Sequence, residues 1–100
     1  MLLYNVTIGI DREIEAEWIR WMKAVHIPNV MASQIFTDYK FFKVLSAEDS
    51  DNPSYCIQYY VPTIEQFNVY LSQYAQPLME EHRNKFSQQH AAYQTLLEEV

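Results

Sequence analysis

Glycine is almost absent from this chain of 100 residues, in which Gly9 is the only one. Phosphate-binding loops and dinucleotide-binding turns need several glycines, because the backbone must approach the phosphate closely. The sequence therefore excludes nucleotide binding of the P-loop and Rossmann types.

Cysteine is equally scarce, since Cys56 stands alone. A single cysteine can form neither an intramolecular disulfide nor a cysteine-based zinc site, and this usage favours a reducing compartment. The first residues lack a basic segment and a cleavage site, so we expect no signal peptide, and no apolar run approaches the length of a membrane span. We therefore expect a cytoplasmic protein that does not enter a membrane.

Basic residues are few and dispersed, with 7 Lys and Arg against 13 Asp and Glu and a formal net charge of -6. This charge repels the backbone of a nucleic acid and the surface of an anionic membrane, so neither is an expected partner. Hydrophobic residues make up 49% of the chain and aromatic residues 15%, which is enough for one packed core. We expect a single domain over residues 1–100.

Four strands are predicted, the first from its alternation of apolar and polar side chains and the second, an expected edge strand, from its content of Phe, Tyr, Thr and Val. In the first, over residues 2–10, Val6 and Ile8 share one face while Asn5 and Thr7 share the other. The remaining strands are predicted over residues 35–45, 55–61 and 91–97. The acidic segment from Ser46 to Pro53 joins the second and third strands as the tip of a hairpin.

Two helical segments are predicted, over residues 12–26 and 63–86, because each carries an apolar stripe of helical period. Pro28 disfavours helical geometry at the residue before it, so the first helix is expected to end near His26, and Pro28 can then open a short second turn through Asn29 to Ser33. Pro77 is expected to kink or restart the second helix.

The centres of the two stripes predict the core. We place Trp18 and Leu71 there, one on each helix. Trp21 lies one turn from Trp18, and the two indoles either pack in the core or line a flat aromatic pocket.

The order of strand, helix, strand, strand, helix and strand is that of the α+β ferredoxin-like βαββαβ fold. Right-handed crossovers lay both helices on one face of a four-stranded antiparallel sheet. The opposite face is then uncovered, and we expect it to carry apolar side chains such as Leu3, Tyr60 and Leu96. A second copy of the chain is the simplest cover for such a face, so we expect a homodimer.

The three histidines are the main candidates for chemistry, because no other unperturbed side chain titrates near neutral pH. His26, His82 and His90 do not have the spacing of metal ligands, so we expect no metal site. His26 is interpreted as a residue favoured by the helix dipole or as a ligand contact. His82 lies on the apolar stripe between Leu78 and Phe86, where it is a hydrogen-bonded core residue or a ligand contact.

A pattern across the strands gives a second hint. One face is predicted to hold Asn5, Thr7, Gln58, Tyr60 and Gln94, and the other to hold Val6, Ile8, Ile57, Tyr59 and Tyr93. The first of these faces is semi-polar, and it could line a small-molecule cavity or a wet subunit interface. The candidate ligand-binding residues are therefore Asn5, Thr7, His26, Gln58, Tyr60 and His82, and no catalytic residue is assigned.

The segment W-x-x-W-M-x-x-x-H-I-P, which runs from Trp18 to Pro28, resembles a family of uncharacterised bacterial proteins. The resemblance extends over nearly the full length of the chain. It includes the opening Y-N-V-T, Gln58 and Tyr59, Pro77, Leu78 and His82, and the closing T-L-L-E at residues 95–98. Similar sequences tend to have glycine before the second strand, where this chain has Ser33 and Gln34, and this departure bears on the geometry of that turn.

The resembled family looks like a member of the dimeric α+β barrel superfamily, in which two ferredoxin-like sheets face each other around a cavity. The resemblance implies a fold and a homodimer but no particular activity. Superfamily relatives include cofactor-free monooxygenases, haem-degrading enzymes and small isomerases, and fold alone does not choose among them. Our leading hypothesis is a homodimeric domain without a cofactor that binds a small ligand or is non-catalytic. The alternative is a monooxygenase-like or haem-degrading-like enzyme acting on a small aromatic or haem-like substrate.

Overall fold

The computed structural model describes residues 1–46, 52–86 and 89–100, with residues 89–91 described by their backbone alone. The described chain has the predicted order of elements. They are β1 (Leu2–Ile10), η1 (Arg12–Ile14), α1 (Glu15–Trp21), η2 (Met22–His26), α2 (Ile27–Met31), β2 (Asp38–Lys43), β3 (Ser54–Val61), α3 (Ile64–Gln73), α4 (Ala75–Lys85) and β4 (Gln89–Glu98).

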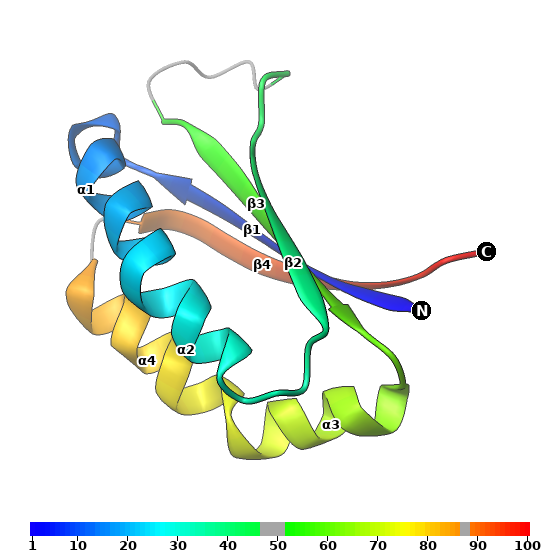
Figure 1. Ribbon diagram of the computed structural model, residues 1–100. Helices are drawn as coiled ribbons and strands as arrows, with labels where there is room; N and C mark the ends of the chain where they lie inside the picture. Colours follow the sequence, from blue (N-terminus) through cyan, green and yellow to red (C-terminus); the bar gives the residue numbers. More distant parts are fainter. Residues whose placement is uncertain (47–51, 87–88) are drawn as a thin grey trace.

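The four strands form one antiparallel sheet in the order β2-β3-β1-β4, and the helices cover one of its faces (Figure 1). Both helical segments contact the same side of the sheet. Trp18 of α1 packs on Tyr55 of β3, with ring centroids 5.1 Å apart, and Phe67 of α3 packs on Tyr4 of β1 at 4.9 Å. The predicted ferredoxin-like α+β fold is confirmed.

The first helical segment does not end near His26, as the sequence suggested, but continues through a π-helical turn, η2, into α2. In this turn the N–H of Ile27 donates to the carbonyl of Met22, five residues earlier. The ring of Pro28 would clash with the carbonyl four residues before it in a regular α-helix, and the wider turn relieves that clash. One extra residue per turn also shifts the apolar stripe. Val25, which the regular spacing placed on that stripe, is therefore exposed.

The second helical segment begins as predicted and breaks before its proline. The side chain of Thr63 accepts a hydrogen bond from the backbone N–H of Gln66 and caps α3. The helix is interrupted at Tyr74, three residues before Pro77, because the proline has no N–H to donate and its ring crowds the preceding turn. The prediction that Leu71 belongs to the core is wrong, since its side chain is 47% exposed.

The core face of α3 is formed by Phe67 and Tyr70. The expected stripe paired Phe67 with Leu71 at a spacing of four, whereas the buried pair has a spacing of three. Both spacings are compatible with one face of a helix. Which of the two residues, Tyr70 or Leu71, is buried therefore depends on where the sheet lies relative to α3.

The turn into β2 contains the only non-glycine residue with positive φ in the described chain, Gln34 at φ 63°. This is the position before the second strand where similar sequences tend to have glycine. The predicted second strand was also too long. Ile35 and Phe36 are buried before β2 begins at Asp38. The predicted hairpin tip includes residues 47–51, which lie outside the described residues.

The two faces of the sheet follow the predicted alternation in β1 and β3, but not in β4. Gln94 pairs with Val6 and Leu96 pairs with Tyr4, so both lie on the side of the helices. Tyr93, opposite Thr7, lies instead on the uncovered face. The predictions for Gln94, Leu96 and Tyr93 are therefore wrong by one residue of register.

The cause lies in the exposure of β4, an edge strand whose residues 92–98 are all exposed. Since neither face of β4 is buried within the subunit, its composition does not reveal which face points inward.

No helix of the described ranges is both long and apolar enough to cross a membrane.

Candidate functional site

The two described histidine rings meet between the two helical segments. His26 ends η2 and His82 lies on α4, and their ring centroids are 5.6 Å apart in an edge-to-face arrangement. Trp21 stacks on His26 with centroids 5.4 Å apart and lies 5.8 Å from His82. The π-helical turn is what brings His26 here, because it turns this residue inward in place of Val25. Such turns occur frequently at functional sites.

A buried hydrogen bond fixes the state of His82. The indole Nε1–H of Trp18 donates to Nε2 of His82 at 2.9 Å, and His82 is only 6% exposed. Because Nε2 accepts this bond, the proton of the neutral imidazole must be on Nδ1. His82 is therefore a donor through Nδ1–H.

One ring nitrogen of His26 lacks a hydrogen-bond partner. Among the described residues, Nδ1 of His26 is buried and has no hydrogen-bond partner. Burial lowers the pKa of His26 to about 4, and burial together with the nearby His26 lowers the pKa of His82 to about 4. Both rings are therefore neutral at pH 7, and a buried unpartnered nitrogen costs free energy unless something else meets it.

A cavity of about 300 Å³ opens beside this pair, between α4 and the strands β1 and β4. Its walls are apolar for the most part, with one amide and one guanidinium. The described lining residues are Val6, Ile8, His26, Met79, His82, Arg83, Ala92 and Gln94. This volume lies at the small end of the range of ligand pockets, about 300–1,000 Å³.

A smaller void of about 50 Å³ lies deeper in the same direction and shares five lining residues with the cavity. Its inner wall includes the phenols of Tyr4, Tyr59 and Tyr70. Burial raises the pKa of Tyr4 to about 12 and raises the pKa values of Tyr59 and Tyr70 further, so all three stay protonated. The deep end of the cavity is therefore uncharged and aromatic.

The histidine pair is poorly arranged for a metal ion. Nε2 of His82 is occupied by the indole of Trp18, so His82 could bind a metal only by losing its Nδ1 proton as well. Arg83 adds a positive charge to the same cavity. In the described ranges, no three His, Cys, Asp or Glu side chains form a group that could hold a metal.

The other predicted site residues lie on the opposite face of the sheet. Asn5 pairs with Gln58, and its side-chain amide donates to Oγ1 of Thr7 at 3.0 Å. Tyr60 lies on the same face, with Nζ of Lys40 6.0 Å from its ring centroid. These residues and the histidines do not meet, because the sheet separates them.

Six lining residues of the histidine cavity were not among the predicted site residues, namely Val6, Ile8, Met79, Arg83, Ala92 and Gln94. Met79 lies three residues before His82 and four before Arg83, so helical spacing from His82 was the available signal for Met79, and that from Met79 the signal for Arg83. Gln94 was singled out but assigned to the wrong face.

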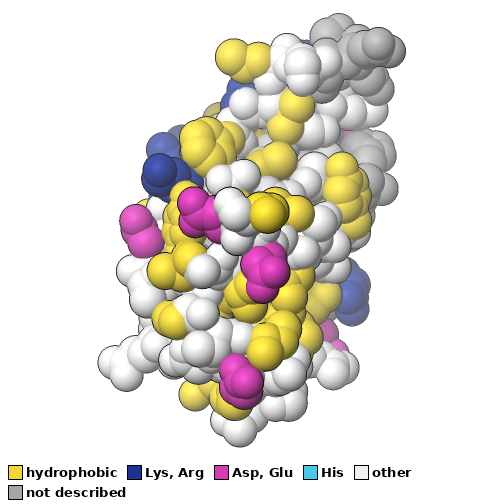
Figure 2. All heavy atoms as spheres, turned by 90° about the vertical axis from the view of Figure 1, so that its right-hand side faces the viewer, with side chains coloured by type: hydrophobic (Ala, Val, Ile, Leu, Met, Phe, Trp, Pro, Cys, Tyr) yellow, Lys and Arg dark blue, Asp and Glu magenta, His cyan; other side chains and the backbone are white. Residues whose placement is uncertain are grey.

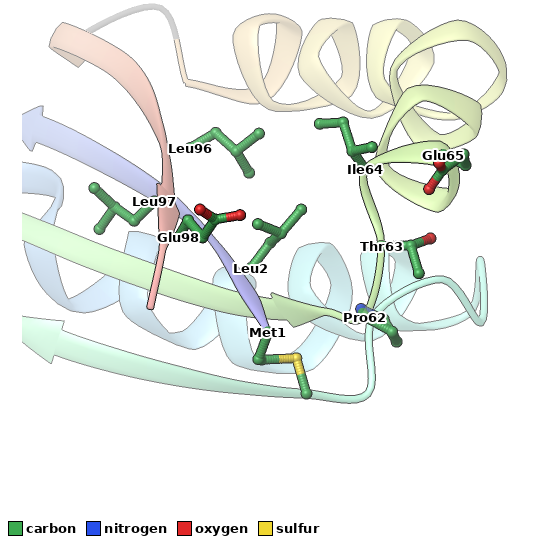
Figure 3. A pocket seen from close by; sticks show the side chains of 9 residues that line it. All are labelled: Met1, Leu2, Pro62, Thr63, Ile64, Glu65, Leu96, Leu97 and Glu98. Carbon is green, nitrogen blue, oxygen red and sulfur yellow. The ribbon is translucent and has the colours of Figure 1, made fainter. Parts of the chain in front are cut away.

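A larger hollow of about 540 Å³ lies at the end of the sheet, between β4 and α3. Figure 3 shows Leu96 and Ile64 pointing toward each other across it, with Leu2 beneath them, while Leu97 points away. Its charged lining residues are Glu65 and Glu98. The hollow is apolar and open, and it has no histidine, so it suits contact with a surface better than chemistry.

Comparison with known families identifies the family of the chain. The family model described as a domain of unknown function (DUF4286) matches residues 1–100. The chain belongs to this family. No curated protein has a significant sequence match to it.

Solved structures share the fold of this DUF4286 chain. An EthD family protein from Bacillus halodurans C-125 has a TM-score of 0.69 and 12% identity, with 100% of each chain covered. A proposed antibiotic biosynthesis monooxygenase from Deinococcus radiodurans has a TM-score of 0.70 and 12% identity, covering 100% of this chain and 93% of its own. A dimeric ferredoxin-like protein from an uncultured marine organism has a TM-score of 0.54 and 10% identity, covering 99% and 98%.

Proposed function

We propose that the chain binds a small, mainly apolar molecule in the cavity beside His26 and His82. The observation that carries this proposal is the His26 ring, which lines a cavity of about 300 Å³ and whose buried Nδ1 has no partner among the described residues. A ligand that reaches this nitrogen would offset the cost of leaving it unpaired. The fixed donor on His82 offers a second polar contact at the same place.

A cavity-filling variant tests this proposal. Ala92 lines the cavity from β4, whereas Ala16 is exposed on α1, so Ala92→Phe and Ala16→Phe make the same chemical change in different places. Small aromatic compounds that bind should raise the melting temperature of the protein, because ligand binding to the folded state stabilises it. The rise should persist in Ala16→Phe and vanish in Ala92→Phe. A rise of equal size in both variants would place binding elsewhere.

Catalysis is the second candidate, and the paired neutral imidazoles favour it. A neutral His26 can accept a proton from a bound substrate while His82 donates a hydrogen bond to it. The Deinococcus radiodurans protein described as a proposed monooxygenase has the same fold. The small cavity volume favours a compact aromatic substrate over a haem-like one.

An oxygen electrode separates catalysis from binding. A naphthol and O₂ give a naphthoquinone and water, so no outside reductant is required. If the chain is an enzyme of this kind, adding 1-naphthol should consume O₂, and His26→Leu should abolish the consumption. If 1-naphthol binds and no O₂ is consumed, the binding proposal stands and this reaction does not.

We further propose that the chain forms a homodimer through the uncovered face of the sheet. Figure 2 shows hydrophobic side chains in several patches among uncharged ones, with separate acidic side chains between some of the patches. The exposed apolar members on this face are Phe42, Tyr93 and Leu97, next to the half-buried Leu3 and Tyr60. A dimeric ferredoxin-like protein shares the fold. A stable contact of this kind should bury on the order of 1,200 Å² or more in total.

Light scattering at micromolar concentration tests the dimer. The mass should be that of two chains and should fall toward one chain in Tyr60→Glu and Leu97→Glu. Glu80→Lys on the exposed surface of α4 is the control and should leave the mass unchanged. Leu96→Glu, which alters the side of the helices, should also have little effect. A mass of one chain for the unmodified protein would refute the dimer.

The single cysteine and the net charge of -6 support two further parts of the proposal, a cytoplasmic location and the absence of nucleic acid among the partners. Asn5, Thr7 and Gln58 would then lie at a wet subunit interface.

A further inference from the structure

The charges around the histidine cavity are unbalanced. Arg83 is the one charged side chain among its described lining residues, in a chain whose net charge is -6. Within the described part of the chain, Arg83 makes no ion pair, and the ion pair that is formed joins Lys43 to Glu15. A guanidinium with no carboxylate partner at the edge of a cavity is suited to an anionic ligand group.

The hydrogen-bond donor that His82 presents also favours an anionic ligand group. The hydrogen bond from Trp18 leaves His82 with its proton on Nδ1, so this ring can donate and not accept at that atom. Trp18 is therefore a positioning residue, because it sets which partner His82 can take. Arg83 follows His82 directly on α4, and both line the same cavity.

The rest of the cavity accommodates an uncharged body. Val6, Ile8, Met79 and Ala92 supply apolar walls, and the deeper void ends among protonated tyrosines. An anionic group buried among these walls would be poorly solvated. The polar group of a ligand therefore belongs beside Arg83 and His82, and its apolar part points inward.

We propose that the ligand of this cavity is a small apolar monoanion with an anionic oxygen, either a carboxylate or a phenolate, on a flat hydrocarbon body. Its anionic oxygen pairs with Arg83 and accepts a hydrogen bond from Nδ1 of His82. This assignment rests on the proposed binding function and adds the chemical class of the ligand to it.

The test compares 1-naphthoate with 1-naphthamide, which has the same ring system and no charge. Binding is followed by NMR through the indole N–H signals of the two tryptophans, which contact the histidines of the cavity. Naphthoate should bind at least tenfold more tightly than naphthamide. 1-Naphthol, titrated at pH 8 and at pH 10, tests the phenolate form, and tighter binding at pH 10 would support it.

Matched variants test the role of Arg83. Arg83→Gln should remove the preference for naphthoate, whereas Lys85→Gln, which removes the same charge two residues away on α4, should retain it. Trp18→Phe should weaken naphthoate binding and should also change the ¹⁵N signals of the His82 ring from one tautomer to a mixture, a change that a merely structural role would not produce.

The outcomes separate the two levels of the proposal. Equal affinity for naphthoate and naphthamide would overturn the anionic class and leave the binding function intact. Equal losses in Arg83→Gln and Lys85→Gln would also overturn it, because the preference would then reflect net charge alone. If none of the three probes shifts the indole signals, the proposed binding function itself is refuted.

Discussion

Removing the hydrogen bond between Trp18 and His82 should destabilise the protein in a way that depends on both residues. Trp18 is fully buried, and its indole donates to His82 at 2.9 Å. Trp18→Phe leaves Nε2 of His82 buried without a partner, which costs about 1–3 kcal/mol. With the lost part of the indole packing, we expect about 2–3 kcal/mol in total, less than the roughly 3–5 kcal/mol of a tryptophan truncated to alanine.

The double variant gives the sharper measurement. His82→Leu leaves the indole N–H unpaired and should also cost about 1–3 kcal/mol. In the combination of Trp18→Phe with His82→Leu, neither partner remains to be left unpaired. The total loss should therefore be smaller than the sum of the two single losses by about 1–2 kcal/mol.

Urea unfolding of the four proteins at one fixed concentration measures this coupling, and the slope of each transition checks that the unfolded states are comparable. Trp18→Phe combined with Val69→Ala, a change on the exposed side of α3, is the control and should be additive. A coupling below about 0.5 kcal/mol between Trp18 and His82, within the range of independent sites, would refute the hydrogen bond.

Three further results are expected. Gln34→Gly should stabilise the protein by about 1 kcal/mol in urea unfolding, because Gln34 has φ 63° and glycine reaches this region without steric cost, and a loss would contradict that geometry. Leu71→Ala should cost less than about 1 kcal/mol and Phe67→Ala about 3–5 kcal/mol, and the reverse order would restore the original helical stripe. As pH falls from 6.5 toward 4, the free energy of unfolding should fall, because unfolded histidines gain protons while His26 and His82, with pKa values lowered to about 4, stay neutral. His82→Leu should flatten this slope, and an unchanged slope in that variant would contradict the shift.

Most of the fold could be predicted because local patterns and packing agreed. In β3 every second side chain is buried, and in β1 Tyr4, Ile8 and Ile10 are buried while Val6 on the same face is half-buried, so the alternation in the sequence indicates the faces of the sheet directly. In β4 no side chain of residues 92–98 is buried, so the sequence of this strand does not indicate which side chains face the helices. Gln94 and Leu96 were misplaced for that reason.

The candidate site was harder to predict, because it depends on one irregular turn. Both histidines were singled out, but a regular helix would have turned Val25 inward and left His26 elsewhere. The extra residue in η2 is a response to Pro28, and its effect on the facing of His26 follows from tertiary geometry. The sequence also grouped His26 with Asn5 and Gln58, although the sheet lies between them. Nothing in residue spacing alone reveals which face of a sheet a helical residue approaches.

The most direct test of the histidine cavity as the binding site is a crystal structure of the protein with 1-naphthoate. The account predicts the carboxylate beside Arg83 and Nδ1 of His82, with the naphthalene rings against Val6 and Met79 between β1 and α4. Naphthoate on the uncovered sheet face beside Asn5 and Gln58, or in the hollow between Leu96 and Ile64, would contradict it.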